Sequence, residues 1–400
     1  MIEVREYQPQ DGPGYVEVHN TVWSGDNAID IETWERWSRQ PITASIALED
    51  GKVVGAVPFH FRDFVLRPGL VIRAAFEYSV CVLERLRSQG IGSKLMDAAK
   101  QFLPAQADAM MVYRGGERTA GYRFYARNSH HDMVFYRNLI WPTPSGQIGD
   151  GVRFCDTEEF LNREAEVLGV FAGAYGCFGG YPQRVSGYHA RAFQSMQYDE
   201  LKSDFHFALA EDDDGLAGYA VLTRWVNGGD LKVAEMATRG GDQLIAHDLF
   251  MAAGARAADL GTTLSISGPD DGLYCAVARS LGFIGRTRAA ASMFIMAHLL
   301  DPPDLAQKTL RRMPELAHTR IEAFTPEADY LLHDPPAPAK TITLETKEEH
   351  LTRLLLCRLD LQAAIREHRV TAYGAADGDI SALAGAFPCC RWEYHALDYI

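Results

Sequence analysis

The chain has 400 residues, of which 47% are hydrophobic, so we expect roughly two to four domains with real cores. Its formal net charge of -14 argues against a nucleic-acid partner and is compatible with a cationic small molecule. The cysteines form no Cys-x-x-Cys pair, Cys389-Cys390 being the only close pair, so we expect no metal site, no disulfide framework and a cytoplasmic location. We also expect no membrane segment, because no stretch of about 18 residues is apolar and uncharged.

The first part of the chain predicts helices flanking a mixed sheet. Residues 2–6 form the first expected strand, and helices are expected around residues 15–23 and 31–39. Alternating apolar residues then predict strands between residues 44 and 73. Within them, the acidic and glycine residues at 49–51 have the chemistry of a hairpin turn.

The most informative stretch is residues 80–92, where a β-branched run becomes a turn of arginine and glycine and then opens a helix. Gly90 and Gly92 allow the backbone to approach a ligand closely, and the N–H groups at the helix N-terminus point at an anion. Arg87 can add a charge-assisted hydrogen bond. The turn therefore predicts a pyrophosphate site, although a tight turn without a ligand has the same pattern.

A dinucleotide-binding fingerprint is the competing interpretation of this turn. That fingerprint needs three glycines and an acidic residue about 20 residues further on, at the end of a second strand, and neither is convincing here. Downstream lies a second motif instead. It consists of an apolar strand at residues 110–113, the segment Gly121-Tyr-Arg-Phe124-Tyr125 and an expected strand at residues 133–141.

Together these motifs resemble the GCN5-related N-acetyltransferases, the GNAT family. Residues 87–92 are similar to that family's coenzyme A loop, and residues 124–130 to its Phe-Tyr-x-x-x-Gly-Phe segment. The resemblance implies acetyl-CoA as co-substrate and Tyr125 as the general acid that returns a proton to the thiolate. Ser129-His130 replaces the usual Gly-Phe, and we interpret His130 as a satisfied surface or capping histidine rather than a catalytic one. The residues expected to bind the coenzyme are Val80, Val82, Arg87, Ser88, Gln89, Gly90, Ile91 and Gly92.

Prolines and a glycine at residues 142–146 mark a linker, and a second domain is expected to begin near Val152. It repeats the order of the first. The expected elements are a helix at 157–175, a hairpin of 205–210 and 216–222, a strand at 231–237, a glycine turn at 239–241, a helix at 244–260 and a strand at 263–267. Ala278 stands where the first domain has Tyr125, and Asp242 places a negative charge beside any incoming phosphate. We therefore predict a degenerate GNAT fold that binds no coenzyme, with a second active site as the alternative.

From Asp301 onward, a proline-rich stretch, a strand at 341–344 and an amphipathic helix at 348–356 resemble the sterol-carrier-like domain that follows tandem acetyltransferase units. An ordinary α+β oligomerisation or lid domain is the alternative. The three-part order resembles the enhanced intracellular survival (Eis) family over all 400 residues. It implies an α/β fold (α+β mixed sheet) with two tandem GNAT folds, the second degenerate, plus the C-terminal α+β domain. The expected boundaries are residues 1–144, 145–298 and 299–400.

That resemblance also implies a base, an oligomer and an acceptor class. In the Eis family the terminal carboxylate reaches into the first domain's cleft as a base, a role that falls here to Ile400, although the aromatic tail is as readily explained by packing alone. Hexamers are typical of that family, and its acceptors are aminoglycosides, other polyamines and protein lysines. The aromatic and acidic residues expected to wall the acceptor cleft are Trp23, Asp26, Trp37 and Glu77, which otherwise are core aromatics or solvated acids.

The sequence thus predicts an acetyl-CoA-dependent N-acetyltransferase for a small-molecule amine, without a metal, nucleic acid or membrane partner and as a homo-oligomer. A prediction from another class is a non-catalytic sensor on a GNAT scaffold whose C-terminal domain holds an apolar ligand. The intact Arg87, Gly90, Gly92 and Tyr125 favour the enzyme. A binding module has no reason to keep an anion loop and a proton donor together.

Overall fold

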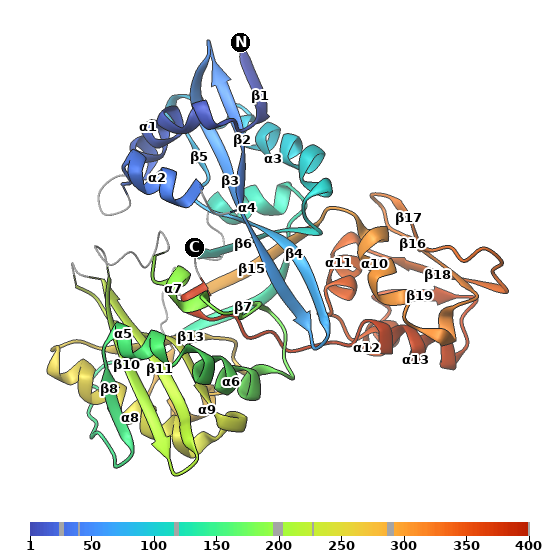
Figure 1. Ribbon diagram of the computed structural model, residues 1–400. Coiled ribbons are helices and arrows are strands. Elements are labelled where there is room, and N and C mark those ends of the chain that lie inside the picture. Colours follow the sequence, from blue (N-terminus) through green and yellow to red (C-terminus); the bar gives the residue numbers. More distant parts are fainter. Residues whose placement is uncertain are drawn as a thin grey trace. The chain divides into compact units, whose positions relative to one another are not determined.

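The computed structural model describes residues 1–23, 28–38, 41–115, 120–194, 203–225, 228–285 and 292–398. The chain divides into two compact units, whose elements are drawn in Figure 1. Unit 1 contains residues 1–114, 119–133 and 295–391, and unit 2 contains residues 115–118, 134–294 and 392–400. The chain passes from unit 1 to unit 2 within β7 (His131–Trp141) and returns to unit 1 within β15 (Ser292–Leu299). It leaves unit 1 again after Arg391.

The main sheet of unit 1 is mixed. Its strands are β1 (Ile2–Glu6), β2 (Ile42–Glu49), β3 (Lys52–Arg67), β4 (Leu70–Glu77), β5 (Cys81–Val82), β6 (Ala109–Gly115) and β15. Their order is β1-β2-β3-β4-β6-β15, with β5 paired to β3. The strands β1 to β4 pair in antiparallel fashion, whereas β4 and β6 are parallel, from Ala74 opposite Ala109 to Glu77 opposite Val112. A parallel step needs a crossover connection, and this one contains the glycine turn and its helix.

The predicted hairpin turn is confirmed. Asp50 and Gly51 have φ angles of 50° and 79°, which suit the left-handed turns that match the twist of paired strands. The strand after the turn, β3, continues to Arg67. Phe64 shows why, because its side chain is fully buried near the far end of β3.

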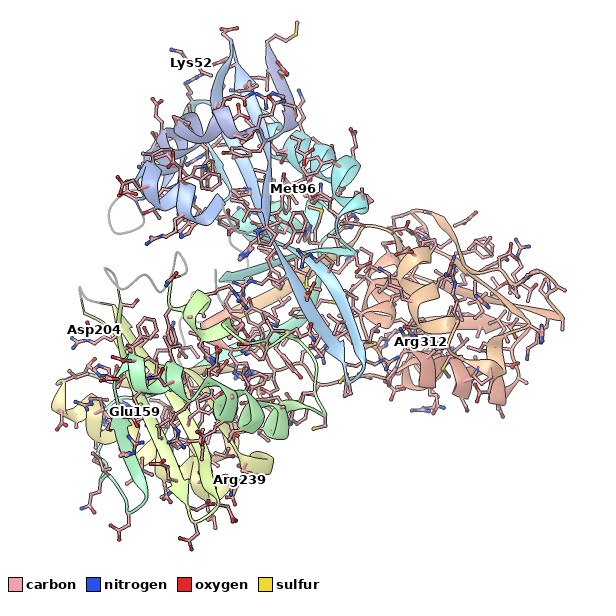
Figure 2. The ribbon with its side chains drawn as sticks, in the orientation of Figure 1. Lys52, Met96, Glu159, Asp204, Arg239 and Arg312 are labelled. Carbon is pink, nitrogen blue, oxygen red and sulfur yellow. The ribbon has the colours of Figure 1, made fainter. Side chains whose placement is uncertain are left out.

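Helices cover the main sheet of unit 1. They are α1 (Gly12–Val22), α2 (Ile31–Ser38), α3 (Ile91–Phe102) and α4 (Ala120–Arg127), with 3-10 turns at Pro9–Asp11, Glu84–Leu86 and Leu103–Ala105. The helix α3 buries Ile91, Leu95, Met96 and Ala99 in one core with strand residues, as its three-to-four spacing predicts. Met96 points from α3 toward the strands in Figure 2. Burying such a side chain stabilises the fold by roughly 1.5–3 kcal/mol.

After β15 the chain forms a second sheet within unit 1. The elements are α10 (Pro302–Leu310), β16 (Thr319–Phe324), β17 (Asp329–His333), β18 (Lys340–Thr346), α11 (Glu348–Leu355), α12 (Leu361–Arg366), β19 (Val370–Tyr373), α13 (Asp377–Ala386) and a 3-10 turn at Pro314–Leu316. The strand order is β17-β16-β18-β19. This part contacts the main sheet, since Leu300 N donates to Asp108 O at 3.0 Å and Arg358 Nε donates to Met133 O at 3.2 Å. Its sterol-carrier-like character and the three domain boundaries stay predictions.

Unit 2 repeats the order of elements of unit 1. Its strands are β8 (Val152–Cys155), β9 (Tyr181–Pro182), β10 (Ser203–Asp212), β11 (Gly215–Trp225), β12 (Leu231–Thr238), β13 (Leu264–Gly268) and β14 (Ile284–Gly285), together with β7. The order is β7-β13-β12-β11-β10-β8. The strands β12 and β13 pair in parallel only from Leu231 opposite Leu264 to Val233 opposite Ile266, although both run on. They therefore leave a mouth between their ends.

The helices of unit 2 are α5 (Thr157–Asn162), α6 (Glu164–Tyr175), α7 (Tyr188–Ala192), α8 (Gln243–Asp259) and α9 (Cys275–Ser280), and 3-10 turns lie at Arg239–Gly241 and Ala396–Asp398. The expectation of one helix over residues 157–175 is wrong, because Arg163 has φ -100° and ψ 12° and separates α5 from α6. The guanidinium of Arg163 pairs there with Glu166 and Glu211. Among the described helices of both units, none is long and apolar enough to cross a membrane.

Candidate active site

The glycine turn of unit 1 ends in an uncapped helix N-terminus. It includes Ser88 and Gly90, with φ angles of 63° and 77°. Gly90 is the N-cap residue of α3, and a glycine has no side chain that could accept from the first N–H groups of the helix. Those N–H groups lack intrahelical partners, and the helix dipole adds partial positive charge. The turn therefore favours an anion.

A cavity of about 680 Å³ opens over this N-terminus. It is lined by every residue predicted to bind the coenzyme except Gln89, whose amide donates to Arg85 O at 3.0 Å. A further wall comes from α4 and the turn after it and was not predicted from the sequence; it consists of Arg123, Phe124, Arg127 and Asn128. Arginines four residues apart on one helix share a face, so their spacing was a usable signal. The cavity thus adds further positive charge to the anion-binding turn.

The glycines of the turn serve different purposes. A Cβ atom at Gly90 would meet nothing within 4 Å, so Gly90 is needed for its positive φ angle. A Cβ atom at Gly92 would lie 2.8 Å from Cε2 of Phe124. Gly92 is therefore needed for the close approach of α3 to α4, which shapes the cavity wall.

Tyr125 lies on α4 next to this wall. Its ring packs edge-on against Phe124, with centroids 5.1 Å apart, and against His130 at 5.5 Å. The residue is 8% exposed and is not among those that line the cavity. Its role as the general acid stays a prediction.

A buried acid–histidine pair fixes the end of α4. His130 Nε2 and Glu77 Oε1 lie 2.6 Å apart, and both side chains are fully buried. The N–H of His130 donates to Tyr125 O at 3.0 Å, and His130 Nδ1 lies 3.2 Å from Asn128 O. Since Glu77 is the last residue of β4, the pair ties the turn after Tyr125 to the sheet. His130 is satisfied as expected, but its placement on the surface was wrong.

A second histidine packs against this pair. His298 on β15 lies with its ring 5.9 Å from that of His130, and its Nδ1 is 3.2 Å from Ser129 O. Burial, followed by the charge of His130, lowers the pKa of His298 to about 3. The second carboxylate oxygen of Glu77, Oε2, is buried and has no hydrogen-bond partner within the described part of the chain. Glu77 thus pairs with one buried histidine, His130, and its role in binding an acceptor stays a prediction.

The structure places the remaining predicted residues in different surroundings. Trp37 is only 5% exposed in the core of unit 1, whereas Trp23, at the end of α1, is 41% exposed. Only Trp23 of the two offers a broad surface to a ligand. Asp26 and Ile400 lie outside the described residues.

The corresponding turn of unit 2 is closed by its own side chains. The carboxylate of Asp242 accepts from Leu244 N at 2.7 Å and from Ile245 N at 3.2 Å, so it occupies the N-terminus of α8. Arg239 pairs with Asp212 at 2.8 Å. Ala278, in the place of Tyr125, is fully buried. These contacts agree with the prediction of a unit that does not bind coenzyme.

Comparison with known families assigns this fold. Residues 7–129 match the family model described as the acetyltransferase (GNAT) family. A search of curated proteins finds no match. The matched residues run from the end of β1 to the turn after Tyr125 and include the whole glycine turn.

Several solved structures share the fold over most or all of the chain. A GCN5-related N-acetyltransferase from Anabaena variabilis superposes with a TM-score of 0.68 at 12% identity, covering 100% of both chains. Eis1 from Mycobacterium abscessus gives 0.57 at 13% identity, again over 100% of both chains. A tandem GNAT protein from the clavulanic acid biosynthesis pathway gives 0.52 at 14% identity, covering 76% of this chain and 99% of its own. Residues 7–129 therefore form a domain of the GNAT acetyltransferase family, and the chain as a whole shares the fold of these structures, among them a tandem GNAT protein and Eis1.

Proposed function

We propose that the chain transfers the acetyl group of acetyl-CoA directly to an amine, with its catalytic site in residues 1–144. The observation that carries this proposal is the open cavity over the uncapped N-terminus of α3. Free N–H groups and the guanidinium groups of Arg87, Arg123 and Arg127 complement the phosphates of coenzyme A. The turn of unit 2 lacks this arrangement because Asp242 caps its helix.

The strand β5 supports binding of the pantetheine arm. Cys81 and Val82 pair with Ala56 and Gly55 of β3, and among the described strands none pairs with the other edge of β5, although Arg87 Nε donates to the Val82 carbonyl at 3.1 Å. Val80 and Val82 both line the cavity. Burial raises the pKa of the Cys81 thiol to about 12, so Cys81 stays protonated and is a core residue. We therefore propose direct transfer without a covalent enzyme intermediate.

The reaction needs one proton donor and one proton acceptor. The neutral amine nitrogen attacks the thioester carbonyl carbon, and the carbon–sulfur bond breaks as the amide forms. Tyr125 gives its phenolic proton to the departing thiolate, and the C-terminal carboxylate of Ile400 takes the proton of the amine, directly or through water. Solvent then returns Tyr125 and Ile400 to their starting states. The packing of Tyr125 against Phe124, which lines the cavity, supports its part in this scheme.

A cationic amine is the acceptor class that we propose, namely an aminoglycoside, a polyamine or a lysine-like group. The net charge of -14 favours such molecules by long-range attraction. The exposed ring of Trp23 can contact a cation, and we propose Asp26 as its acidic partner in the acceptor wall, whereas Trp37 and Glu77 are buried and offer little surface to a ligand.

We also propose the finer organisation of the chain. A catalytic GNAT domain at residues 1–144, a degenerate GNAT domain at 145–298 and a sterol-carrier-like domain at 299–400 follow from the resemblance to the Eis family. The separate four-stranded sheet with its helices after residue 300 supports the third domain. The same resemblance suggests a cytoplasmic homo-oligomer, a hexamer.

Isothermal titration of the full chain with acetyl-CoA, paired with a thiol-release assay, tests the proposed function. The assay panel contains aminoglycosides, polyamines and lysine peptides. We expect one acetyl-CoA per chain and thiol release with at least one amine. Binding without release on any amine would instead favour the sensor, and no binding would make the glycine turn purely structural.

A further inference from the structure

The end of the chain is docked in unit 2. We call residues 392–398 the tail, and every one of them is buried. Trp392 and Asp398 are both 0% exposed. Aromatic and apolar burial of this extent needs a matching surface, so unit 2 contains a site shaped for the tail.

That site is the mouth where β12 and β13 stop pairing. Glu393, Tyr394 and His395 lie beside Val233–Met236 of β12 and Ile266–Gly268 of β13, around a residual cavity of only about 30 Å³. Two backbone donors anchor the tail, because Glu393 N donates to Gly179 O at 2.8 Å and Leu273 N donates to Glu393 Oε1 at 2.9 Å. In element order β12 and β13 correspond to β4 and β6 of unit 1. The tail thus fills a mouth that corresponds, in element order, to the ends of β4 and β6.

A glycine makes room for the tail. A Cβ atom at Gly180 would lie 2.2 Å from the Cβ atom of Trp392, and Gly180 has a φ angle of 84°. The hydroxyl of Tyr136 accepts from Tyr394 N at 2.9 Å. The unit therefore fits the backbone of the tail as well as its side chains.

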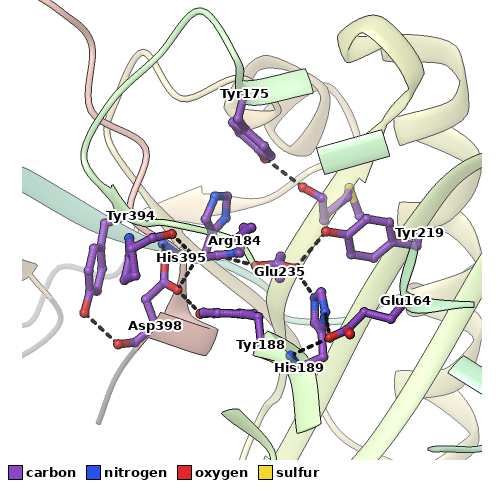
Figure 3. A network of polar contacts seen from close by, with 12 residues as sticks. Glu164, Tyr175, Arg184, Tyr188, His189, Tyr219, Glu235, Tyr394, His395 and Asp398 are labelled. Atoms are coloured by element: carbon purple, nitrogen blue, oxygen red, sulfur yellow. Dashed lines mark hydrogen bonds and ion pairs between the residues drawn. The ribbon is translucent and has the colours of Figure 1, made fainter. Parts of the chain in front are cut away.

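Arg184 is the centre of the attachment, as Figure 3 shows. Its guanidinium pairs with Asp398 Oδ1 at 2.8 Å and with Glu235 Oε2 at 2.5 Å. It also lies over the rings of Phe171 and Tyr188, at 4.4 and 4.0 Å from their centroids. Burial alone would lower the pKa of Arg184, but the charges of Asp398 and Glu235 raise it well above its ordinary value. Arg184 is therefore charged in a closed site.

The tail complements this charge. Besides the ion pair, Asp398 accepts hydrogen bonds from the Tyr188 hydroxyl and from His395 N, the latter at 3.1 Å. The Tyr394 hydroxyl donates to Asp398 O at 2.7 Å. Glu235 remains paired with Arg184, with His189 at 3.0 Å and with Tyr219 at 2.7 Å, independently of the tail. Removing the Asp398 carboxylate thus weakens the tail without leaving Arg184 uncompensated.

We propose that the mouth between β12 and β13 is a binding site for an acidic, aromatic peptide, and that the chain's own tail is its ligand, selected by Arg184 through Asp398. Unit 2 then binds a peptide between the ends of its two parallel strands. Arg184 holds Asp398, which stands two residues before Ile400 in the chain. Arg184 thereby becomes a positioning residue for Ile400. This last consequence alone rests on the proposed function, in which the Ile400 carboxylate is the base.

Hydrogen exchange of the full-length Asp398→Asn variant tests the site without measuring turnover. The amides of the tail are expected to exchange roughly tenfold faster or more, because an ion pair to a buried arginine is lost. Peptides from β12 should keep their protection. The matched control is Asp379→Asn, which removes an acid paired with Lys340 in unit 1 and should leave the tail protected. Unchanged exchange of the tail in Asp398→Asn would overturn the proposal.

A second measurement tests the proposal even if Asp398→Asn destabilises unit 2 as a whole. Trp392→Ala changes only the tail. The probe is a fluorescent synthetic peptide of residues 392–400. This variant should bind the peptide at least roughly tenfold more tightly than the wild-type chain, because the tail occupies the site in the wild type. A peptide carrying Asp398→Asn should bind at least tenfold more weakly. Equal binding of the two peptides would overturn selection by Arg184. Faster tail exchange with unchanged turnover would support the peptide site and would reject only the terminal carboxylate as base.

Discussion

The N-termini of α3 and α8 are the clearest contrast between the two GNAT units. Both helices follow a glycine turn, but Gly90 leaves the N-terminus of α3 uncapped, while the Asp242 carboxylate caps α8. The turn before α3 can therefore attract an anion, whereas the turn before α8 already contains the Asp242 carboxylate. The residue at the N-cap therefore decides whether a helix N-terminus is open to an external anion or is capped by a side chain of the chain itself.

The cavities of the two units also differ in volume. Unit 1 has a cavity of about 680 Å³, whereas unit 2 has about 30 Å³ around the tail. The first volume is in the range of small-molecule sites, and the second holds little more than a water molecule. Unit 1 thus has an open cavity at its glycine turn, whereas the mouth between β12 and β13 of unit 2 is filled by the tail.

The largest effect that tests this contrast is expected from Gly92→Glu. The new side chain would meet Phe124 and bring a negative charge to the anion site, so acetyl-CoA binding should be abolished in isothermal titration. The matched control is Leu244→Glu, which adds the same group at the corresponding position of α8, where the side chain is 78% exposed. Wild-type affinity in Gly92→Glu, or lost affinity in Leu244→Glu, would reverse the assignment of the two turns.

The next effect concerns the tyrosine that unit 2 lacks. Tyr125→Phe should keep the affinity for acetyl-CoA and lower turnover by roughly one to four orders of magnitude, because the thiolate loses its proton donor. Tyr122→Phe is the control on the same helix, since its hydroxyl lies 3.4 Å from Asp132 instead. Wild-type turnover in Tyr125→Phe would move the proton donor to another group or to water.

The glycine turn of unit 1 was easier to predict from the sequence than the docking site of the tail in unit 2. The glycine turn and Tyr125 are local patterns, so they were found, whereas Arg123 and Arg127 enter the cavity only because α4 packs against α3 at Gly92. The burial of His130 depends on Glu77, more than fifty residues away in the chain. The docking of Asp398 on Arg184 likewise joins distant segments that no local spacing reveals. Long-range ion pairs of this kind leave no periodic signal in a single sequence.

Acid should distinguish the units as well. The pKa of His298 in unit 1 is about 3, below its ordinary value of 6.5, so below pH 6.5 the unfolded chain binds this proton more readily than the folded one. Stability from the neutral His298 is therefore complete above about pH 6.5 and is lost as the pH falls toward 3. In unit 2, hydrogen bonding to His189 is the main cause that lowers the pKa of Glu164 to about 2, so its contribution is lost only below its ordinary value of 4.5.

Denaturant unfolding between pH 7 and pH 4 measures this difference. His298→Gln should flatten the dependence of the unfolding free energy on pH by up to one proton, or about 1.4 kcal/mol per pH unit. His247→Gln is the control, because His247 lies on the surface of unit 2 beside Asp248. Parallel pH profiles for the wild type and His298→Gln would show that this histidine is not the acid-sensitive group.

The smallest effect comes from removing the cap of α8. Asp242→Ala should lower the unfolding free energy by about 1 kcal/mol, the usual cost of losing an N-cap side chain. It should nevertheless leave the stoichiometry at one acetyl-CoA per chain, because the tail still fills the mouth between β12 and β13 and Arg239 remains paired with Asp212. Titration of the variant at high acetyl-CoA concentration measures this directly. A second bound acetyl-CoA would mean that one carboxylate alone closes unit 2, and that the rest of its turn still has the shape of a coenzyme site.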